Sequence, residues 1–113
     1  MYFKNADHKS LFEEYQVRAR AEGDKEYTVL CYLLAALDKP LLDYLRPRNI
    51  NIDGIKAASR IWSSGEKALV KLAINIFTDG SGPAKVNEIF RSLDTVNVKV
   101  ALEGLTIRYG QTA

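Results

Sequence analysis

The most informative segment of the chain runs from Ser63 to Gly80 and reads SSGEKALVKLAINIFTDG. Ser63 and Glu66 have the spacing of a capping box, which marks a helix start, and Gly80 can adopt the left-handed conformation that ends a helix. The apolar residues between them cover an arc of about 240° at about 100° per residue. A helix this apolar must be nearly surrounded by protein, so the segment predicts the centre of a fold. Its only polar strip consists of Lys67, Lys71, Asn75 and Thr78.

A second strongly apolar segment spans residues 25–37 and, unlike the first, leaves no polar face. It predicts a second central helix, packed against residues 64–78. Caps, proline positions and apolar spacing predict shorter helices around these two. They are expected at residues 7–21, at 40–45, between Asn51 or Asp53 and Ser59, and at 84–93.

Residues 95–109 allow two interpretations. Apolar residues alternate on both sides of Glu103-Gly104, which is the pattern of a β-hairpin. Glutamate fits a primed turn poorly, however, and a lone hairpin in a helical protein is marginal. Asp94 or Thr95 could cap a helix instead, although its interior Gly104 would make that helix about 1 kcal/mol less stable than alanine would. We favour the helix and therefore predict an all-α bundle of five to six helices with two central apolar helices, with α plus a C-terminal hairpin at 95–109 as the alternative.

Composition indicates one globular domain covering residues 1–113. Hydrophobic residues make up 47% of the chain and charged residues 27%, close to the globular average. The longest nearly unbroken apolar run, residues 27–37, is well short of the roughly 20 residues that span a bilayer, and the N-terminus lacks a signal pattern. We expect a cytoplasmic protein without membrane contact. The single cysteine, Cys31, is expected to be a small core residue in a reducing compartment.

No set of residues predicts catalysis, a cofactor or a metal site. His8 is the only histidine, and no nucleophile or orienting carboxylate is identifiable beside it. Ser64 and Lys67 have the Ser-x-x-Lys spacing of penicillin-recognising enzymes, but the companion motifs are missing and helix capping explains the serine. One histidine and one distant cysteine cannot form a four-ligand zinc site. The sequence therefore favours a protein that is not an enzyme.

Two segments are candidate anion-binding sites. The turn holding Ser81, Gly82 and Lys85 leads into a helix start and could hold a phosphate on free backbone N–H groups. The second candidate is the only local concentration of positive charge, which would contact nucleic acid phosphates through Arg46, Arg48, Lys56 and Arg60. Asp38, Asp43 and Asp53 lie in the same stretch, so a solvated surface of mixed charge is the favoured interpretation. A net charge of +2 also argues against a strong nucleic acid binder.

Several short motifs, spread over most of the chain, resemble motifs of a known group of proteins. These motifs are Phe3 and His8, Tyr32-Leu33-Leu34, Trp62, Leu72-Ala73-Ile74-Asn75-Ile76-Phe77 with a glycine soon after, and Ile107-Arg108-Tyr109-Gly110. With them the chain resembles short uncharacterised all-helical proteins of Gram-positive bacteria and their phages. The resemblance implies a helix at residues 95–109 and an origin in bacterial or mobile-element DNA. It supplies no catalytic residues.

Two functional hypotheses follow from these patterns. The leading one is a non-enzymatic protein-protein interaction or adaptor module, whose partner is another protein or a second copy of the chain. It rests on the absence of a catalytic set from the sequence. The alternative is a small nucleic-acid-binding regulator that uses the basic connector around Arg46 and Arg48.

Overall fold

The computed structural model describes residues 1–80 and 84–110 and confirms the all-α prediction. Six α-helices account for most of the described chain. They are α1 (Ala6–Ala19), α2 (Lys25–Ala35), α3 (Ile52–Ser59), α4 (Ser64–Phe77), α5 (Val86–Arg91) and α6 (Thr95–Tyr109). A short 3-10 helix, η1 (Leu42–Tyr44), and two strands, β1 (Leu45–Arg46) and β2 (Asn49–Ile50), connect α2 to α3. No helix in the described residues is both long and apolar enough to span a bilayer.

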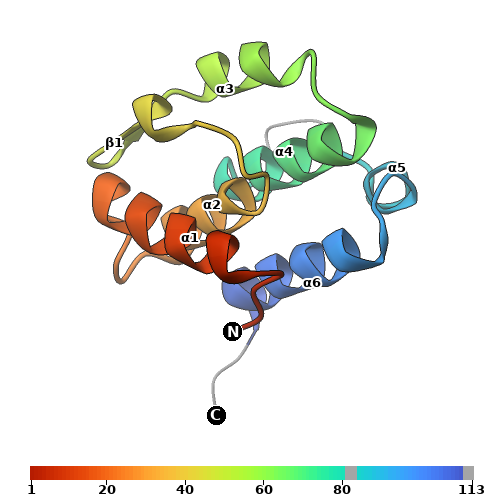
Figure 1. Ribbon diagram of the computed structural model, residues 1–113, viewed down its shortest axis with the longest axis horizontal. Helices are drawn as coiled ribbons and strands as arrows, with labels where there is room; N and C mark the ends of the chain where they lie inside the picture. Colours follow the sequence, from red (N-terminus) through yellow and green to blue (C-terminus); the bar gives the residue numbers. More distant parts are fainter. Residues whose placement is uncertain (81–83, 111–113) are drawn as a thin grey trace.

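Helices α2 and α4 form the centre of the molecule, as predicted. Helix α2 packs against α1, α4 and α6, and α4 also contacts α3 and α5 (Figure 1). Every residue from Val29 to Leu37 is buried, because neighbours surround α2 on all sides. In α4 the apolar arc is buried, whereas Lys67 and Lys71 are exposed. Helix α3 lies above α4 in Figure 1, and α5 lies near one end of α4.

Helix α4 begins and ends where its sequence predicts. The Ser63 hydroxyl oxygen accepts the Glu66 N–H at 3.2 Å, and a Glu66 carboxylate oxygen accepts the Ser63 N–H at 3.0 Å, which completes a capping box. At the other end Gly80 has φ 87° and donates its N–H to the Asn75 carbonyl at 2.8 Å. Asp79 is also left-handed, with φ 54°, so two residues turn the chain away from the helix.

Residues 95–109 form helix α6, so the alternative of a C-terminal hairpin is wrong. The side of α6 that faces α2 is made of small residues, including Ala101 and Gly104. A Cβ atom at Gly104 would lie 2.9 Å from the Cδ2 atom of Leu33. Gly104 therefore allows two helices to approach closely, and the packing of the pair offsets its poor helix propensity.

Three local predictions differ from the structure. The helix expected at 40–45 is only the 3-10 turn η1, and the helix expected at 84–93 is shortened to Val86–Arg91. The predicted connector holds an antiparallel hairpin in which Leu45 pairs with Ile50. Pro47 fixes φ at its first turn position, and Arg48 supplies the positive φ, 56°, that the second position needs. An arginine gives no sequence signal for that conformation, because glycine or asparagine is usual there.

Candidate functional site

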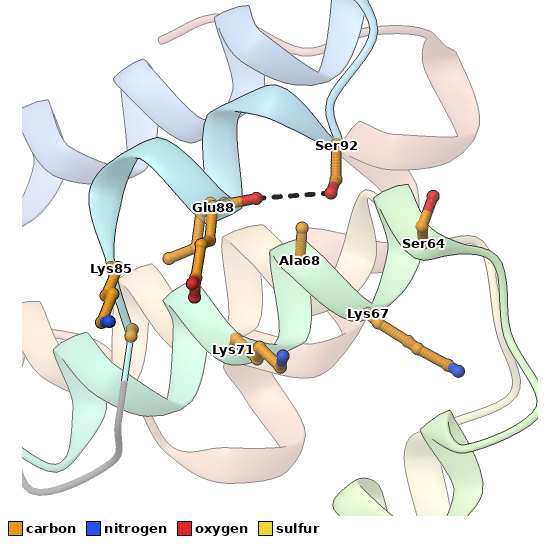
Figure 2. A pocket seen from close by; sticks show the side chains of 9 residues that line it. Ser64, Lys67, Ala68, Lys71, Lys85, Glu88 and Ser92 are labelled. Atoms are coloured by element: carbon orange, nitrogen blue, oxygen red, sulfur yellow. Dashed lines mark hydrogen bonds between the residues drawn. The ribbon is translucent and has the colours of Figure 1, made fainter.

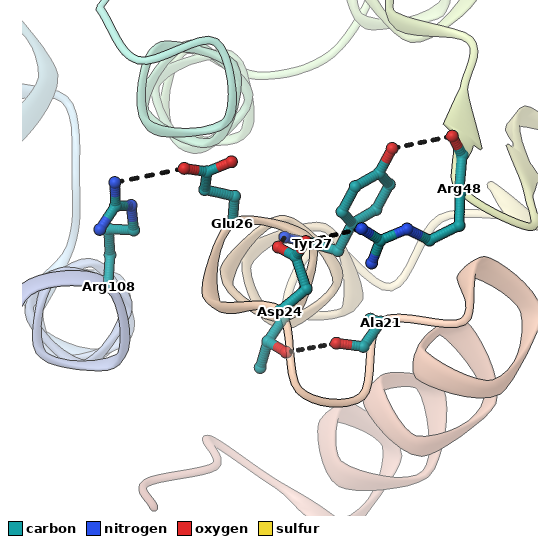
Figure 3. Close-up of polar contacts among 7 residues, drawn as sticks. Ala21, Asp24, Glu26, Tyr27, Arg48 and Arg108 are labelled. Carbon is teal, nitrogen blue, oxygen red and sulfur yellow. Dashed lines mark hydrogen bonds and ion pairs between the residues drawn. The ribbon is translucent and has the colours of Figure 1, made fainter.

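Arg48, predicted as a nucleic acid contact, makes several contacts within the fold. Its Nη2 atom lies 3.0 Å from Oδ2 of Asp24, and its guanidinium lies 4.5 Å from the centre of the Tyr27 ring. The Tyr27 hydroxyl donates to the Arg48 carbonyl at 2.8 Å, and the Arg48 N–H donates to the Ala19 carbonyl at 3.0 Å. Figure 3 shows this cluster at the start of α2. These contacts hold the strained turn residue in place and tie the hairpin to α1 and α2.

Arg46 lies on β1, where it pairs with Asn49, and it is exposed. A shallow hollow beside it is also lined by Asp43 and Asp53. Their carboxylates offset the positive charge of Arg46, as expected for a surface of mixed charge. Arg46 and Arg48 therefore do not join Lys56 and Arg60 in one basic surface.

Lys56 and Arg60 lie on a different feature, a groove between α3 and α4. The α3–α4 groove has a volume of 340 Å³, and its wall is mainly apolar. Val70 and Ile74 form its floor and are almost fully covered. It is lined by Lys56, Ser59, Arg60, Lys67, Val70, Lys71 and Ile74.

Four cations line the groove, in two pairs. Lys56 and Arg60 are four residues apart at the end of α3, and Lys67 and Lys71 are four residues apart on α4. Residues with this spacing lie on the same face of a helix. All four side chains are exposed, no ion pair joins them to an acid of the described residues, and no acidic residue lines the groove. Like charges around an apolar wall raise the local positive potential and attract anions.

A second depression, the α4–α5 hollow, shares Lys67 and Lys71 with the groove. It also has a volume of 340 Å³ and adds Lys85 and Glu88 from the α5 side. In the view of Figure 2 the Glu88 carboxylate lies between the Lys71 and Lys85 side chains. This carboxylate reduces the positive potential of the α4–α5 hollow. The α3–α4 groove differs, because all the charged residues that are described in its lining are cations.

The predicted anion-binding turn is described only in part. Ser81 and Gly82 lie outside the described residues, while Lys85 lines the α4–α5 hollow. Lys85 is the N-cap residue of α5, and its side chain makes no capping hydrogen bond. The structure therefore places Lys85 in the same hollow as Lys67 and Lys71 of α4. The sequence predicts these two lysines only as part of the polar strip of that helix.

His8 and Cys31 are buried inside the core. The His8 ring is 1% exposed, its Nε2 atom lies 2.9 Å from the Tyr32 carbonyl, and its Nδ1 atom lies 3.2 Å from the Lys4 nitrogen. This pairing suits a neutral ring with the proton on Nε2, and burial lowers the pKa of His8 below its usual value. Cys31 is fully buried, which raises the pKa of its thiol to about 12. Neither group is accessible to a substrate.

No cluster of three or more potential ligands from histidine, cysteine, aspartate and glutamate occurs within residues 1–80 and 84–110. The ion pairs found there are Lys39–Glu66, Arg48–Asp24 and Arg108–Glu26. Two of them join separate elements near the start of α2, and the third supports the start of α4. These three acids have structural partners, whereas the cations that line the α3–α4 groove are joined to no acid of the described residues.

The sequence predicts a binding role for only two of the four cations that line this groove. Lys56 and Arg60 were predicted as basic contacts, and Lys67 and Lys71 were recognised as the polar strip of the central helix. The missing step was the packing of α3 against α4, which brings the two pairs to one groove. A turn of only four residues between Ser59 and Ser64 was the available signal, because short connections place helices side by side.

Comparison with known proteins gives a family match. The model of DUF6075, described as a family of unknown function, matches residues 1–113. No match was found among curated proteins or among solved structures. The match spans every element of the α3–α4 groove.

Proposed function

Because the chain belongs to DUF6075, a family of unknown function, we propose its role from its surface: it is a non-enzymatic interaction module that docks a partner protein at the α3–α4 groove. The observation that carries this proposal is the pairing of four exposed cations with a mainly apolar wall. Protein recognition combines these two features, since apolar contact supplies affinity and charge supplies orientation and specificity.

The interior supports a non-enzymatic role. His8 has partners at both ring nitrogens and Cys31 is fully covered, so the two groups best suited to acid-base or nucleophilic chemistry serve the core. A catalytic base must reach the proton that it removes, which a ring 1% exposed does not do. The proposal also retains a cytoplasmic location and an origin in bacterial, phage or mobile-element DNA.

Affinity capture with matched variants tests this proposal. The tagged wild-type protein, the groove variant Lys67→Gln/Lys71→Gln and the control Lys9→Gln/Lys99→Gln would each be exposed to lysate of a native host. Lys9 and Lys99 are exposed on α1 and α6, so the control removes the same charge elsewhere. We expect a protein that wild type and control retain and the groove variant loses. Identical capture by all three proteins would contradict the proposal.

A second copy of the chain is one form that the protein partner can take. Light scattering after size-exclusion chromatography measures the molar mass of wild type and groove variant side by side. A dimer that dissociates in the groove variant identifies the groove as a contact between copies. A dimer unaffected by the substitutions assigns self-association to another face.

A small nucleic-acid-binding regulator is the second candidate, and the exposure of Lys56 and Arg60 favours it. Binding of labelled DNA and RNA would be measured over a series of salt concentrations, because phosphate contacts weaken as salt rises. Binding at low salt that the groove substitutions abolish supports this candidate. Absence of binding at low salt removes it.

A further inference from the structure

We infer that the α3–α4 groove takes an acidic amphipathic helix from its partner, with apolar side chains against the wall and carboxylates beside the two cation pairs. This inference rests on the proposed function and specifies the chemistry of the docking segment. It follows from the wall, from the spacing of the cations and from the side chains that line the groove.

The wall requires an apolar component in the bound segment. Its floor is formed by Val70 and Ile74, and the carbon stems of lysine and arginine can extend an apolar surface toward solvent. A volume of 340 Å³ is near the lower end of ligand-sized pockets, about 300 to 1,000 Å³. It suits a few inserted side chains, while the backbone of the segment stays outside.

The cations require carboxylates on both sides of that apolar stripe. Lys56 and Arg60 flank the groove on α3, and Lys67 and Lys71 flank it on α4. Each pair is separated by four residues, a rise of about 6 Å along its helix. Acidic residues four apart on a bound helix repeat this spacing, so one helix can present carboxylates to both pairs.

The lining favours a peptide over a nucleic acid. Single-stranded nucleic acids are held by positive grooves with aromatic side chains on which bases stack, and none of the described residues that line this groove is aromatic. Ser59 is the neutral polar residue among the described residues of the lining, and its hydroxyl donates to the Lys56 carbonyl at 2.8 Å. Base stacking therefore has no aromatic platform among these residues, whereas carboxylates and apolar side chains both find complementary surfaces.

Fluorescence anisotropy with designed peptides tests the inference. The probe is a labelled helical peptide with a leucine stripe flanked on both sides by glutamates four residues apart. One comparison peptide replaces the leucines with glutamines, and another replaces the glutamates with lysines. We expect the probe to bind at least about tenfold more tightly than either comparison peptide, and binding to weaken as salt is raised.

Two groove variants test the site itself. Lys67→Gln/Lys71→Gln and Lys56→Gln/Arg60→Gln each remove one cation pair at exposed positions, and Lys9→Gln/Lys99→Gln is the matched control. Each groove variant should weaken probe binding by about tenfold, the summed effect of two exposed ion pairs, while the control leaves it unchanged. Thermal unfolding of each variant verifies that it is folded, and two independent groove variants keep the test valid if one is not.

The outcomes separate this inference from the proposed function. Equal binding of the leucine and glutamine peptides, or equal loss in groove and control variants, overturns the inference. Tight binding of labelled DNA or RNA without peptide binding overturns it in favour of a phosphate polymer. Groove-dependent capture of a partner protein without probe binding leaves the proposed function in place but removes the acidic helix as its ligand.

Discussion

His8 shows how one buried side chain joins the N-terminal segment to the central helix. Its ring nitrogens connect Lys4 to the Tyr32 carbonyl, and the Tyr32 hydroxyl donates in turn to the Tyr2 carbonyl. The rings of Phe3 and Tyr32 lie against it, with centres 5.2 Å and 4.7 Å from the centre of the imidazole. Because Nδ1 accepts the Lys4 N–H, protonation of that nitrogen would break the link.

This arrangement predicts a stability that depends on pH. The folded pKa of His8 lies below 6.5, so the unfolded chain takes up the proton first as the pH falls. The contribution to the free energy of unfolding is complete above pH 6.5 and declines below it, by at most about 1.4 kcal/mol per pH unit. Urea denaturation of wild type and His8→Gln from pH 8 to pH 5 measures the difference. Parallel pH profiles for the two proteins would contradict the assignment of a neutral ring.

The two ends of α4 show how much of an element its own residues determine. Ser63, Glu66 and Gly80 predicted its boundaries, because caps satisfy backbone groups within a few residues of one another. Glu66 has a second role, since its carboxylate lies 3.2 Å from the Lys39 amine. Burial alone would raise the pKa of Glu66, but the Ser63 N–H and Lys39 outweigh it and lower the pKa.

Removing the cap should destabilise the protein through α4 alone. Ser63→Ala deletes the side-chain acceptor for the Glu66 N–H, and we expect the free energy of unfolding to fall by about 1 kcal/mol. Ser63→Asp is the control, because aspartate is an equally good N-cap residue. Urea denaturation gives both values. A loss of the same size in both variants would show that the capping bond is not the source of the effect.

Helix α6 shows what local patterns miss. The alternation of its apolar residues, taken alone, is typical of a hairpin, although caps and turn chemistry favour the helix. Two of the residues that it buries, Ala101 and Gly104, are small and add no apolar periodicity. Val96, Leu102 and Tyr109 stay 45%, 52% and 57% exposed, whereas Val100 is fully buried, so only part of the alternating apolar set packs into the core. The deciding contact, between Gly104 and Leu33, joins residues far apart in the sequence.

Enlarging Gly104 should therefore separate α6 from α2. We expect Gly104→Val to lower the free energy of unfolding by about 1 to 3 kcal/mol, because its side chain would overlap Leu33. Leu102→Val, on the exposed side of the same helix, should change it by less than about 0.5 kcal/mol. Thermal or urea unfolding compares them. Equal effects of the two substitutions would mean that close approach at Gly104 is not what orients α6.

At the scale of the whole molecule, tertiary packing decides which basic residues share a surface. The chain places Arg46, Arg48, Lys56 and Arg60 within 15 positions, yet Arg48 is tied to Asp24 and Tyr27, and Arg46 lies near acids. Helix packing then adds two lysines of α4 to the remaining pair. Linear charge density could therefore predict a basic patch but not which residues share it, since that depends on contacts between helices.

Substitutions in the hairpin test this division of roles. Arg46→Gln and Arg48→Gln should leave binding of the acidic amphipathic peptide within about twofold of wild type, because neither side chain lines the α3–α4 groove. Arg48→Gln should also lower the free energy of unfolding by up to about 1 kcal/mol, as expected for an exposed ion pair. Anisotropy titrations and urea denaturation measure the two effects. A tenfold loss of binding in either variant would contradict the groove as the binding site.

The most direct test of docking at the α3–α4 groove is a heteronuclear NMR titration of the isotope-labelled protein with the acidic amphipathic peptide. We predict that the amide shifts that change cluster in α3 and in the exposed strip of α4, around Lys56, Arg60, Lys67 and Lys71. Amides of the β1–β2 hairpin and of the exposed side of α1 should stay unchanged. Changes centred on the hairpin or on α6, or no changes at saturating peptide, would contradict the account.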